Sequence, residues 1–351
     1  MTVHIGRATS RLETISAALP DVAGQSLTAT ELGAELSRLV GQVVPHDGYM
    51  YVGLDPLTEA GCFFGKENGY STAASRRLER DDDLGGDVNP FRRLMSGSSQ
   101  VGVLSADMPE FRNSARLRDV MMVEGFGSEL RIVAPDRGVV WGALVLLRER
   151  DRRPFSWDEA LSAQRLVPSL AVALRRFIGA KPLRPTRLTR PPGVVLVGAN
   201  DQIASATPSG YQWLDELARD AAVDDGQLSG LLWNITYRAR RATTEPVIAR
   251  IPTPDGWVAM HAQPLQPGPQ AEVAVTIQPA PASLLLPALA AWYGLTRRER
   301  EILDQSVNGL PAKQIARALR LSQHTVHDHL KAIYHKTGVS GREELLAGIT
   351  S

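Results

Sequence analysis

The C-terminal segment, residues 295–351, constrains the fold most, because helix caps and apolar stripes alternate along it. Thr296 with Glu299 has the spacing of a capping box, and Gly309 stands where a left-handed helix C-cap is expected. Pro311 suits the first position of a second helix. The apolar stripes comprise Ile302, Leu303, Val307 and Leu310, then Ile315, Ala316 and Leu319, then Val326, Leu330 and Ile333, and finally Leu345, Leu346 and Ile349. The spacing therefore predicts four short helices around one core.

A tight turn is expected between the second and third helices, at Leu321 and Ser322, with Ser322 capping the third helix. Gly338 would end that helix, and Ser340 with Glu343 would cap the fourth. A short helix, a tight turn and a longer helix form a helix-turn-helix, whose second helix enters the DNA major groove. The outer face of that helix carries His324, Thr325, His327, Asp328, Lys331 and His335.

Basic charge is concentrated in this same segment. The whole chain has a net charge of only +1, yet residues 291–351 carry nine basic and six acidic side chains. Residues 1–178 carry 21 basic and 23 acidic side chains, and residues 179–290 carry nine of each. The positive charge therefore lies where it can meet phosphates.

The segment closely resembles the DNA-binding domain of LuxR-type regulators. Three motifs carry the resemblance without a gap: LTRREREIL (Leu295–Leu303), GLPAKQIARALRLSQHTVHDHLKAIYHKTGV (Gly309–Val339) and GREEL (Gly341–Leu345). The resemblance covers Leu295 to Ile349 and implies a bacterial DNA-binding transcriptional regulator.

The resemblance implies a recognition helix over Ser322–Thr337. It places His327, Asp328 and Lys331 in the groove, against base edges. Phosphates would be contacted or faced by Lys313, Thr325, His329 and Lys336. Ser322 and His324, at the start of the helix, complete the candidate DNA-binding residues.

Two residues depart from the family pattern. The family usually has Lys or Gln where His327 stands, which alters base preference, and Ser or Thr where Pro311 stands, which removes a hydroxyl contact. Asp328 would repel phosphate but can accept a hydrogen bond from a cytosine amino group, which favours specificity over affinity. His324, His327 and His329 are close enough for a metal site, but neither a nearby Cys nor a Glu in register accompanies them, so no metal or cofactor is expected.

Residues 26–178 have the pattern of an α+β domain with an antiparallel sheet, after a helical extension over residues 1–25. Its signals are a capping box at Thr28 and Glu31, a hairpin formed by Ser128–Val133 and Val139–Leu147 around a turn at 135–138, and a long helix capped by Ser156 and Glu159. The stretches LGAELSRLV, YMYVGL, VVWGALVLLRE and PFSWDEALSAQRLVPSLAVALRRF resemble a GAF domain, whereas residues 65–127 are not diagnostic.

Residues 179–193 combine Pro and Arg and are expected to form an extended linker that does not pack. Residues 194–278 follow with GVVLVGANDQIASATPSGYQWL, IARIPTPDGWVAMHAQPL and EVAVTIQP, which resemble a degenerate PAS domain. Residues 279–294 would form a second linker and a connecting helix. The expected fold class is multidomain α+β and all-α: a GAF-like antiparallel-sheet domain, a smaller PAS-like α+β domain, and a C-terminal four-helix bundle at 295–351.

GAF and PAS domains bind small molecules or protein partners in a pocket between one sheet face and its helices. Candidate pocket residues in the first domain are Tyr49, Tyr51, Cys62, Phe64, Met121 and Trp141. Core packing is the competing interpretation for all of these side chains. A lone Cys in a strand is more often a small buried hydrophobe than a redox sensor, and His46 is interpreted as a loop residue.

Several functional classes are excluded by absent patterns. A single cysteine excludes a disulfide framework and a Cys-rich zinc finger and fits a reducing cytoplasm. No apolar stretch reaches the roughly 18 residues of a membrane span, so no membrane partner is expected. The sequence lacks a phosphate-binding P-loop, a GxSxG elbow, an HExxH motif and the Asp and Lys spacing of a phosphoreceiver, so no enzymatic activity is expected.

The sequence thus predicts a cytoplasmic regulator that binds double-stranded DNA. A homodimer is expected, because one domain of about 60 residues makes too few base contacts for tight specific binding. A small-molecule effector or a protein contact would act on the front domains, and RNA polymerase is a further expected partner. The alternative is a sensor whose helix-turn-helix mainly docks another protein, either polymerase or a partner regulator.

Overall fold

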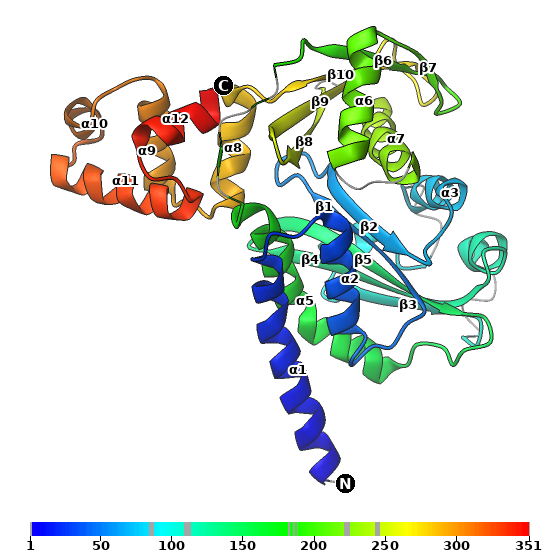
Figure 1. Cartoon of the computed structure of the whole chain (residues 1–351). Helices are drawn as coiled ribbons and strands as arrows, with labels where there is room; N and C mark the ends of the chain where they lie inside the picture. The colour runs from blue at the N-terminus through cyan, green and yellow to red at the C-terminus, as the bar shows by residue number, and fades with distance from the viewer. Residues whose placement is uncertain are drawn as a thin grey trace. The chain divides into compact units, whose positions relative to one another are not determined.

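The structure of the chain is a computed structural model (Figure 1). The chain forms two compact units. The structure describes residues 2–83, 88–108, 114–181, 183, 184, 187, 189–220, 225–242 and 246–350. The first unit comprises Met1–Leu54, Phe63–Leu174 and Ala222–Trp233, and the second comprises Asp55–Cys62, Arg175–Ala221 and Asn234–Ser351.

A five-stranded sheet of order β2-β1-β5-β4-β3 organises the first unit. Its strands are β1 (Gly48–Leu54), β2 (Gly61–Glu67), β3 (Val101–Ser105), β4 (Phe126–Asp136) and β5 (Val139–Glu149). The helices are α1 (Thr2–Ala23), α2 (Ala29–Val40), α3 (Thr72–Asp83), α4 (Phe91–Ser96), a π-turn η2 (Leu117–Met121) and α5 (Trp157–Gly179), whose last turn belongs to the second unit. The predicted antiparallel hairpin is confirmed as β4 and β5.

Local backbone chemistry explains why that hairpin forms. Arg137 and Gly138 both have positive φ, 51° and 82°, as a two-residue hairpin turn requires. The capping box of α2 is also confirmed, since Thr28 accepts from Glu31 N–H and Glu31 accepts from Thr28 N–H. By contrast, α3, α4, β3 and η2 lie in the part of the domain for which the sequence carries no diagnostic pattern.

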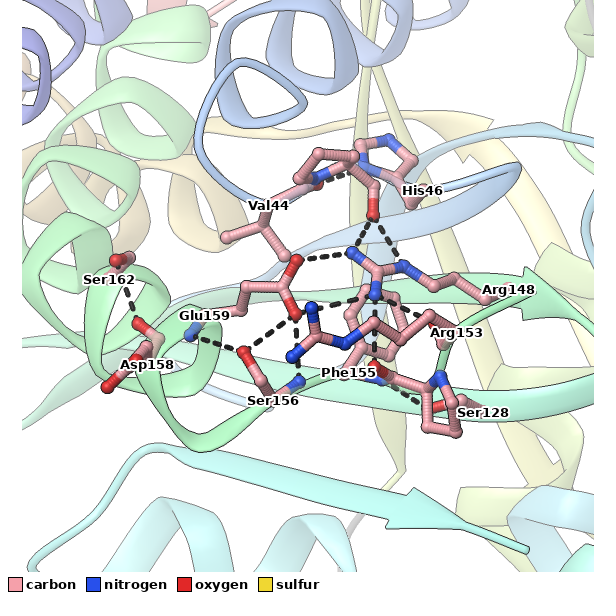
Figure 2. A network of polar contacts seen from close by, with 12 residues as sticks. Val44, His46, Ser128, Arg148, Arg153, Phe155, Ser156, Asp158, Glu159 and Ser162 are labelled. Carbon is pink, nitrogen blue, oxygen red and sulfur yellow. Dashed lines mark hydrogen bonds and ion pairs between the residues drawn. The ribbon is translucent and has the colours of Figure 1, made fainter. Parts of the chain in front are cut away.

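Arg148 at the end of β5 holds the start of α5 (Figure 2). Its guanidinium donates to the Pro45 carbonyl and, at 2.5 Å, to Oε1 of Glu159, and it lies 4.1 Å from the centre of the Phe155 ring. Glu159 and Ser156 form the predicted capping box at the start of the helix. Burial alone would raise the pKa of Glu159, but hydrogen bonds from Arg148 and Ser156 hold that pKa below its usual value. This network fixes α5 against the sheet.

The second unit contains another five-stranded antiparallel sheet, of order β7-β6-β10-β9-β8. Its strands are β6 (Gly193–Val197), β7 (Ile203–Ala206), β8 (Val247–Thr253), β9 (Gly256–Pro264) and β10 (Val273–Pro279), and its helices begin with α6 (Pro208–Asp220) and α7 (Asp225–Arg241). Helix α7, whose first half belongs to the first unit, has no counterpart in the sequence prediction.

Helix α8 (Ala282–Trp292) connects this sheet to the C-terminal bundle. Trp292 stacks on Trp257 of β9 with 4.8 Å between ring centres. The Pro/Arg-rich segment before β6 also packs here, contrary to the expectation from its composition: Leu183 is fully buried and donates its N–H to the Thr337 carbonyl at 2.9 Å. Arg187 N–H also donates to the Asp255 carbonyl at 2.7 Å, so described residues of this segment are held by a buried apolar side chain and by satisfied backbone groups.

In the part of the chain that the structure describes, no helix is both long and apolar enough to cross a membrane.

Candidate nucleic-acid interface

The C-terminal bundle is made of four helices, as predicted. They are α9 (Arg297–Val307), α10 (Ala312–Leu319), α11 (Gln323–Thr337) and α12 (Arg342–Thr350). Side chains from all four are buried together, and they are Ile302, Leu303, Ile315, Ala316, Val326, Leu330, Ile333, Leu345 and Ile349. The capping box of Thr296 and Glu299 starts the first helix, and Gly309 has φ of 83°, as expected after a helix end.

The turn between α10 and α11 is fixed by backbone geometry and by one cap. Arg320 adopts the left-handed conformation, with φ 55° and ψ 47°, and Leu321 N–H donates to the Ala316 carbonyl at 2.8 Å. Ser322 Oγ then accepts from Thr325 N–H at 3.0 Å. The crossing of the two helices is therefore set by residues of the turn itself.

Helix α11 has two opposite faces. Its buried face carries Val326, Leu330, Ile333 and Thr337. The face on the other side is exposed and carries His324, His327, Asp328, Lys331 and His335. Spacings of three, four, seven and eleven residues place these five side chains on one stripe. His324 and Asp328 approach each other across one turn, with 3.6 Å between Nε2 and Oδ2. Hydrogen-bonding groups that suit base edges are thus presented outward.

Lys336, for which the family resemblance predicts a phosphate contact, points toward the start of α9 and is partly exposed. Its ammonium donates to both carboxylate oxygens of Glu299, at 2.9 and 2.7 Å, and to the Gly294 carbonyl at 3.1 Å. Burial alone would raise the pKa of Glu299, but the hydrogen bonds from Lys336 and Thr296 hold that pKa below its usual value. Lys336 therefore fastens α11 to α9.

The other predicted phosphate contacts lie nearer the surface. Lys313 on α10 is exposed, whereas Thr325 and His329 are partly buried on α11. Arg317 and Arg320 are also exposed on or directly after α10 and extend the basic surface that Lys313 begins. The family pattern did not single out these two arginines, although their spacing from Lys313 along the sequence indicates a shared surface.

Two details of the bundle differ from the prediction by one residue. Pro311 is the N-cap of α10 and not its first helical residue. Ser340 is paired with Glu344 in place of Glu343, and its N–H and hydroxyl each donate to Glu344 Oε2 at 2.7 Å. Both differences fall at helix ends, where a one-residue change in register costs little.

The predicted pocket residues of the front domain are divided between the two faces of the sheet. Tyr49 and Tyr51 point toward α2. Their rings lie so close to Gly33 of that helix that a Cβ atom added there would be only 3.0 and 2.7 Å from them. Phe64 projects to the opposite face, since its neighbour Phe63 lies beside Tyr51 with 6.1 Å between ring centres. Strand alternation therefore prevents the six residues from lining one cavity through their side chains.

The remaining pocket candidates are buried elsewhere. Met121 is fully buried in a core cluster with Leu104 and Phe126. Trp141 is buried on β5. Cys62 belongs to the second unit, where burial raises the pKa of its thiol well above the usual value and the charge of Asp55 adds to the shift. A thiol held neutral in this way is a poor nucleophile.

Comparison with known proteins agrees with the geometry of the bundle. The sequence profile described as "Bacterial regulatory proteins, luxR family" matches residues 294–347. The spore germination protein GerE of Bacillus subtilis is 40% identical over 50 residues, which is 14% of this chain and 68% of GerE. This chain belongs to the LuxR family of bacterial regulatory proteins.

The match of this LuxR-family chain to a second curated relative is also short. A protein described as "Probable transcriptional regulatory protein SgaR", from Hyphomicrobium methylovorum, is 47% identical over 53 residues. That match spans 15% of this chain and 25% of the length of SgaR. Among solved structures, Escherichia coli SdiA has a TM-score of 0.36 and 15% identity, with 95% of this chain and 94% of that chain covered.

Proposed function

We propose that this protein is a sequence-specific DNA-binding transcriptional regulator that acts as a homodimer. One observation carries the proposal. The exposed stripe of α11 presents His327, Asp328 and Lys331 outward, while the opposite face of that helix is buried in the bundle. A preorganised helix with hydrogen-bonding side chains on its outer face is what major-groove recognition requires.

Within this interface we assign two kinds of contact. Lys331, His327 and Asp328 would meet base edges and determine sequence preference, because they occupy the exposed stripe. Lys313, with Arg317 and Arg320 beside it, would meet phosphates and supply affinity without sequence preference. Lys336 is left out of the phosphate contacts, since Glu299 and the Gly294 carbonyl occupy its ammonium.

The homodimer follows from the size of the interface. A single helix-turn-helix reads only a few base pairs, so tight specific binding needs two copies on two half-sites about one helical turn apart. The expected operator is therefore a dyad. We place control by an effector in the first compact unit, whose sheet and covering helices are separate from the DNA-reading helix.

The test is to incubate the purified full-length protein with fragmented genomic DNA at physiological salt and to sequence the fragments that remain bound. A protein in which Lys331 and His327 are both replaced by Ala is the matched control, because both side chains are exposed and contribute nothing to the buried core. Enrichment of a dyad site by the unchanged protein, and its loss with the control, would support the proposal.

A different result would contradict the proposal. A protein that enriches no sequence, but binds RNA polymerase or another regulator through the same two side chains, would show that the helix-turn-helix docks a protein. Cross-linking of the full chain on an enriched site would in turn distinguish two bound copies from one.

A further inference from the structure

The first compact unit contains a pocket whose lining includes two of the six predicted pocket residues, Tyr51 and Phe64. It lies on the face of the sheet that faces α3, and it is lined by β1, β2 and α3. The side chains that matter here are Met50, Phe64, Lys66, Ser75 and Arg76, and Trp233 from the first half of α7 adds a further apolar surface.

Strand alternation brings three of these side chains to one face. Phe64 and Lys66 are two residues apart on β2, and Met50 lies on the neighbouring strand with its side chain opposite to those of Tyr49 and Tyr51. Tyr51 also borders the pocket, but its hydroxyl donates to the Ala29 carbonyl at 2.5 Å, on the α2 side of the sheet. The apolar walls are therefore formed by Met50 and Phe64 with Trp233.

The polar part of the pocket is cationic. Lys66 and Arg76 both line it, and no carboxylate is found among its described lining residues. The Lys66 ammonium donates to the Tyr70 carbonyl at 3.3 Å, which is a neutral acceptor. Two like charges beside an apolar wall raise the local potential and favour an anion.

Two polar atoms of the pocket are buried without a hydrogen-bond partner in the described structure. They are the Oγ of Ser75 and the Nε of Arg76, which are consecutive residues of α3. Most buried polar atoms in folded proteins have a partner, because an unsatisfied one costs free energy. Ser75 and Arg76 both line the pocket, and an acceptor bound there is the candidate partner of their side chains.

We propose that this pocket binds a small organic carboxylate that carries an apolar group. The carboxylate would accept hydrogen bonds from the Arg76 guanidinium and the Ser75 hydroxyl and would be attracted by the Lys66 ammonium. Its apolar part would lie on Met50, Phe64 and Trp233. The inference rests on the proposed function, since it names the chemical class of the effector that would act on the first unit.

The test uses the purified full-length protein and four acids as probes: acetate, butyrate, benzoate and phenylacetate. Binding is measured by isothermal titration calorimetry at constant ionic strength, with benzyl alcohol as an uncharged analogue of benzoate. We expect saturable binding that strengthens from acetate to the larger acids, and weaker binding of benzyl alcohol by about tenfold or more, since a charge-assisted hydrogen bond is lost.

Three variants test whether the acid binds in this pocket. Arg76→Gln and Lys66→Gln should each weaken binding of the best acid by about tenfold or more. Arg77→Gln is the matched control, because Arg77 is the next residue of α3 but is half exposed and pairs with Asp119. Its affinity should remain within about twofold of the unchanged protein. Thermal melting of each variant verifies that it is folded.

The outcomes separate this inference from the proposed function. Equal binding of benzoate and benzyl alcohol, an equal loss in Arg76→Gln and Arg77→Gln, or failure of all four acids to bind would each overturn the pocket assignment. DNA binding to an enriched site is measured on the same preparations. DNA binding without carboxylate binding would overturn only the pocket assignment. Carboxylate binding without DNA binding would support the pocket assignment and contradict the proposed function.

Discussion

Asp55 and Arg250 form a buried ion pair in the second compact unit, with 2.5 Å between Oδ2 and Nη1. Their side chains are 0% and 5% exposed. The other oxygen of Asp55 accepts backbone N–H groups of its own loop, and Arg250 Nε donates to the Leu284 carbonyl of α8. One arginine on β8 thus contacts both the 55–60 loop, which joins β1 to β2, and α8, the helix before the C-terminal bundle.

Arg250→Met should strongly destabilise the protein, because it leaves the Asp55 carboxylate buried without a counter-charge. We expect the free energy of unfolding to fall by about 3–5 kcal/mol, measured by urea denaturation of the full chain at pH 7. The double variant Asp55→Leu with Arg250→Met should lose less, since no charge is stranded. Arg137→Met, at an exposed turn, serves as the control. Equal losses in the single and double variants would contradict the expected cost of an unpaired carboxylate.

Lys331→Ala should weaken binding to an enriched operator by about 1–3 kcal/mol and relax sequence preference, as expected for a side chain that reads a base. The residue is exposed, so the variant should keep its melting temperature. Fluorescence anisotropy on operator DNA and on random DNA measures both effects. An equal loss of affinity on the two DNAs would show that Lys331 contacts only phosphate.

Lys313→Ala should act differently from Lys331→Ala, because we assign Lys313 to a phosphate. Affinity should fall on every DNA sequence, and the slope of log affinity against log salt should become shallower by about one. Titrations at several salt concentrations measure that slope. Arg317→Ala, on the same exposed surface of α10, should behave in the same way. A slope that stays unchanged in Lys313→Ala would remove this residue from the interface.

The parts of the fold that could be predicted are those determined by nearby residues. The capping boxes of Thr296 with Glu299 and of Thr28 with Glu31 each depend on atoms three residues apart, so their chemistry is visible in the sequence. The buried stripe of α11 follows in the same way from its spacing. Local hydrogen bonds and helical periodicity were therefore sufficient to predict the four helices of the bundle.

What the sequence did not reveal depends on distant residues or on the choice of sheet face. Helix α7 buries three consecutive residues, Leu231 to Trp233, so its buried surface extends beyond the single apolar stripe by which a surface helix is identified. The family resemblance assigns Lys336 to a phosphate, whereas its partner Glu299 is 37 residues away and is brought beside it only by the fold. Arg76 belongs to a stretch without a diagnostic pattern, so its place beside Lys66 emerged only from the folded structure.

Lys181 should make stability depend on pH in the alkaline range. Burial lowers the pKa of its ammonium from 10.5 to about 8, and the Nζ lies 4.0 Å from the centre of the Phe177 ring. Between pH 8 and 10.5 the unfolded chain therefore binds more protons than the folded chain, so stability should rise with pH across this window. Below about pH 8 both states are protonated, and the buried charge opposes folding.

Lys181→Met keeps most of the side-chain volume and removes the charge. The variant should be more stable than the unchanged protein below about pH 8, and this advantage should shrink steadily up to pH 10.5. Urea denaturation at a series of pH values gives the difference between the two proteins, which cancels the titration of all other groups. Lys313→Met, at an exposed position, should show no such change with pH. A constant difference between Lys181→Met and the unchanged protein from pH 7 to 10.5 would mean that the folded chain does not lower the pKa of Lys181.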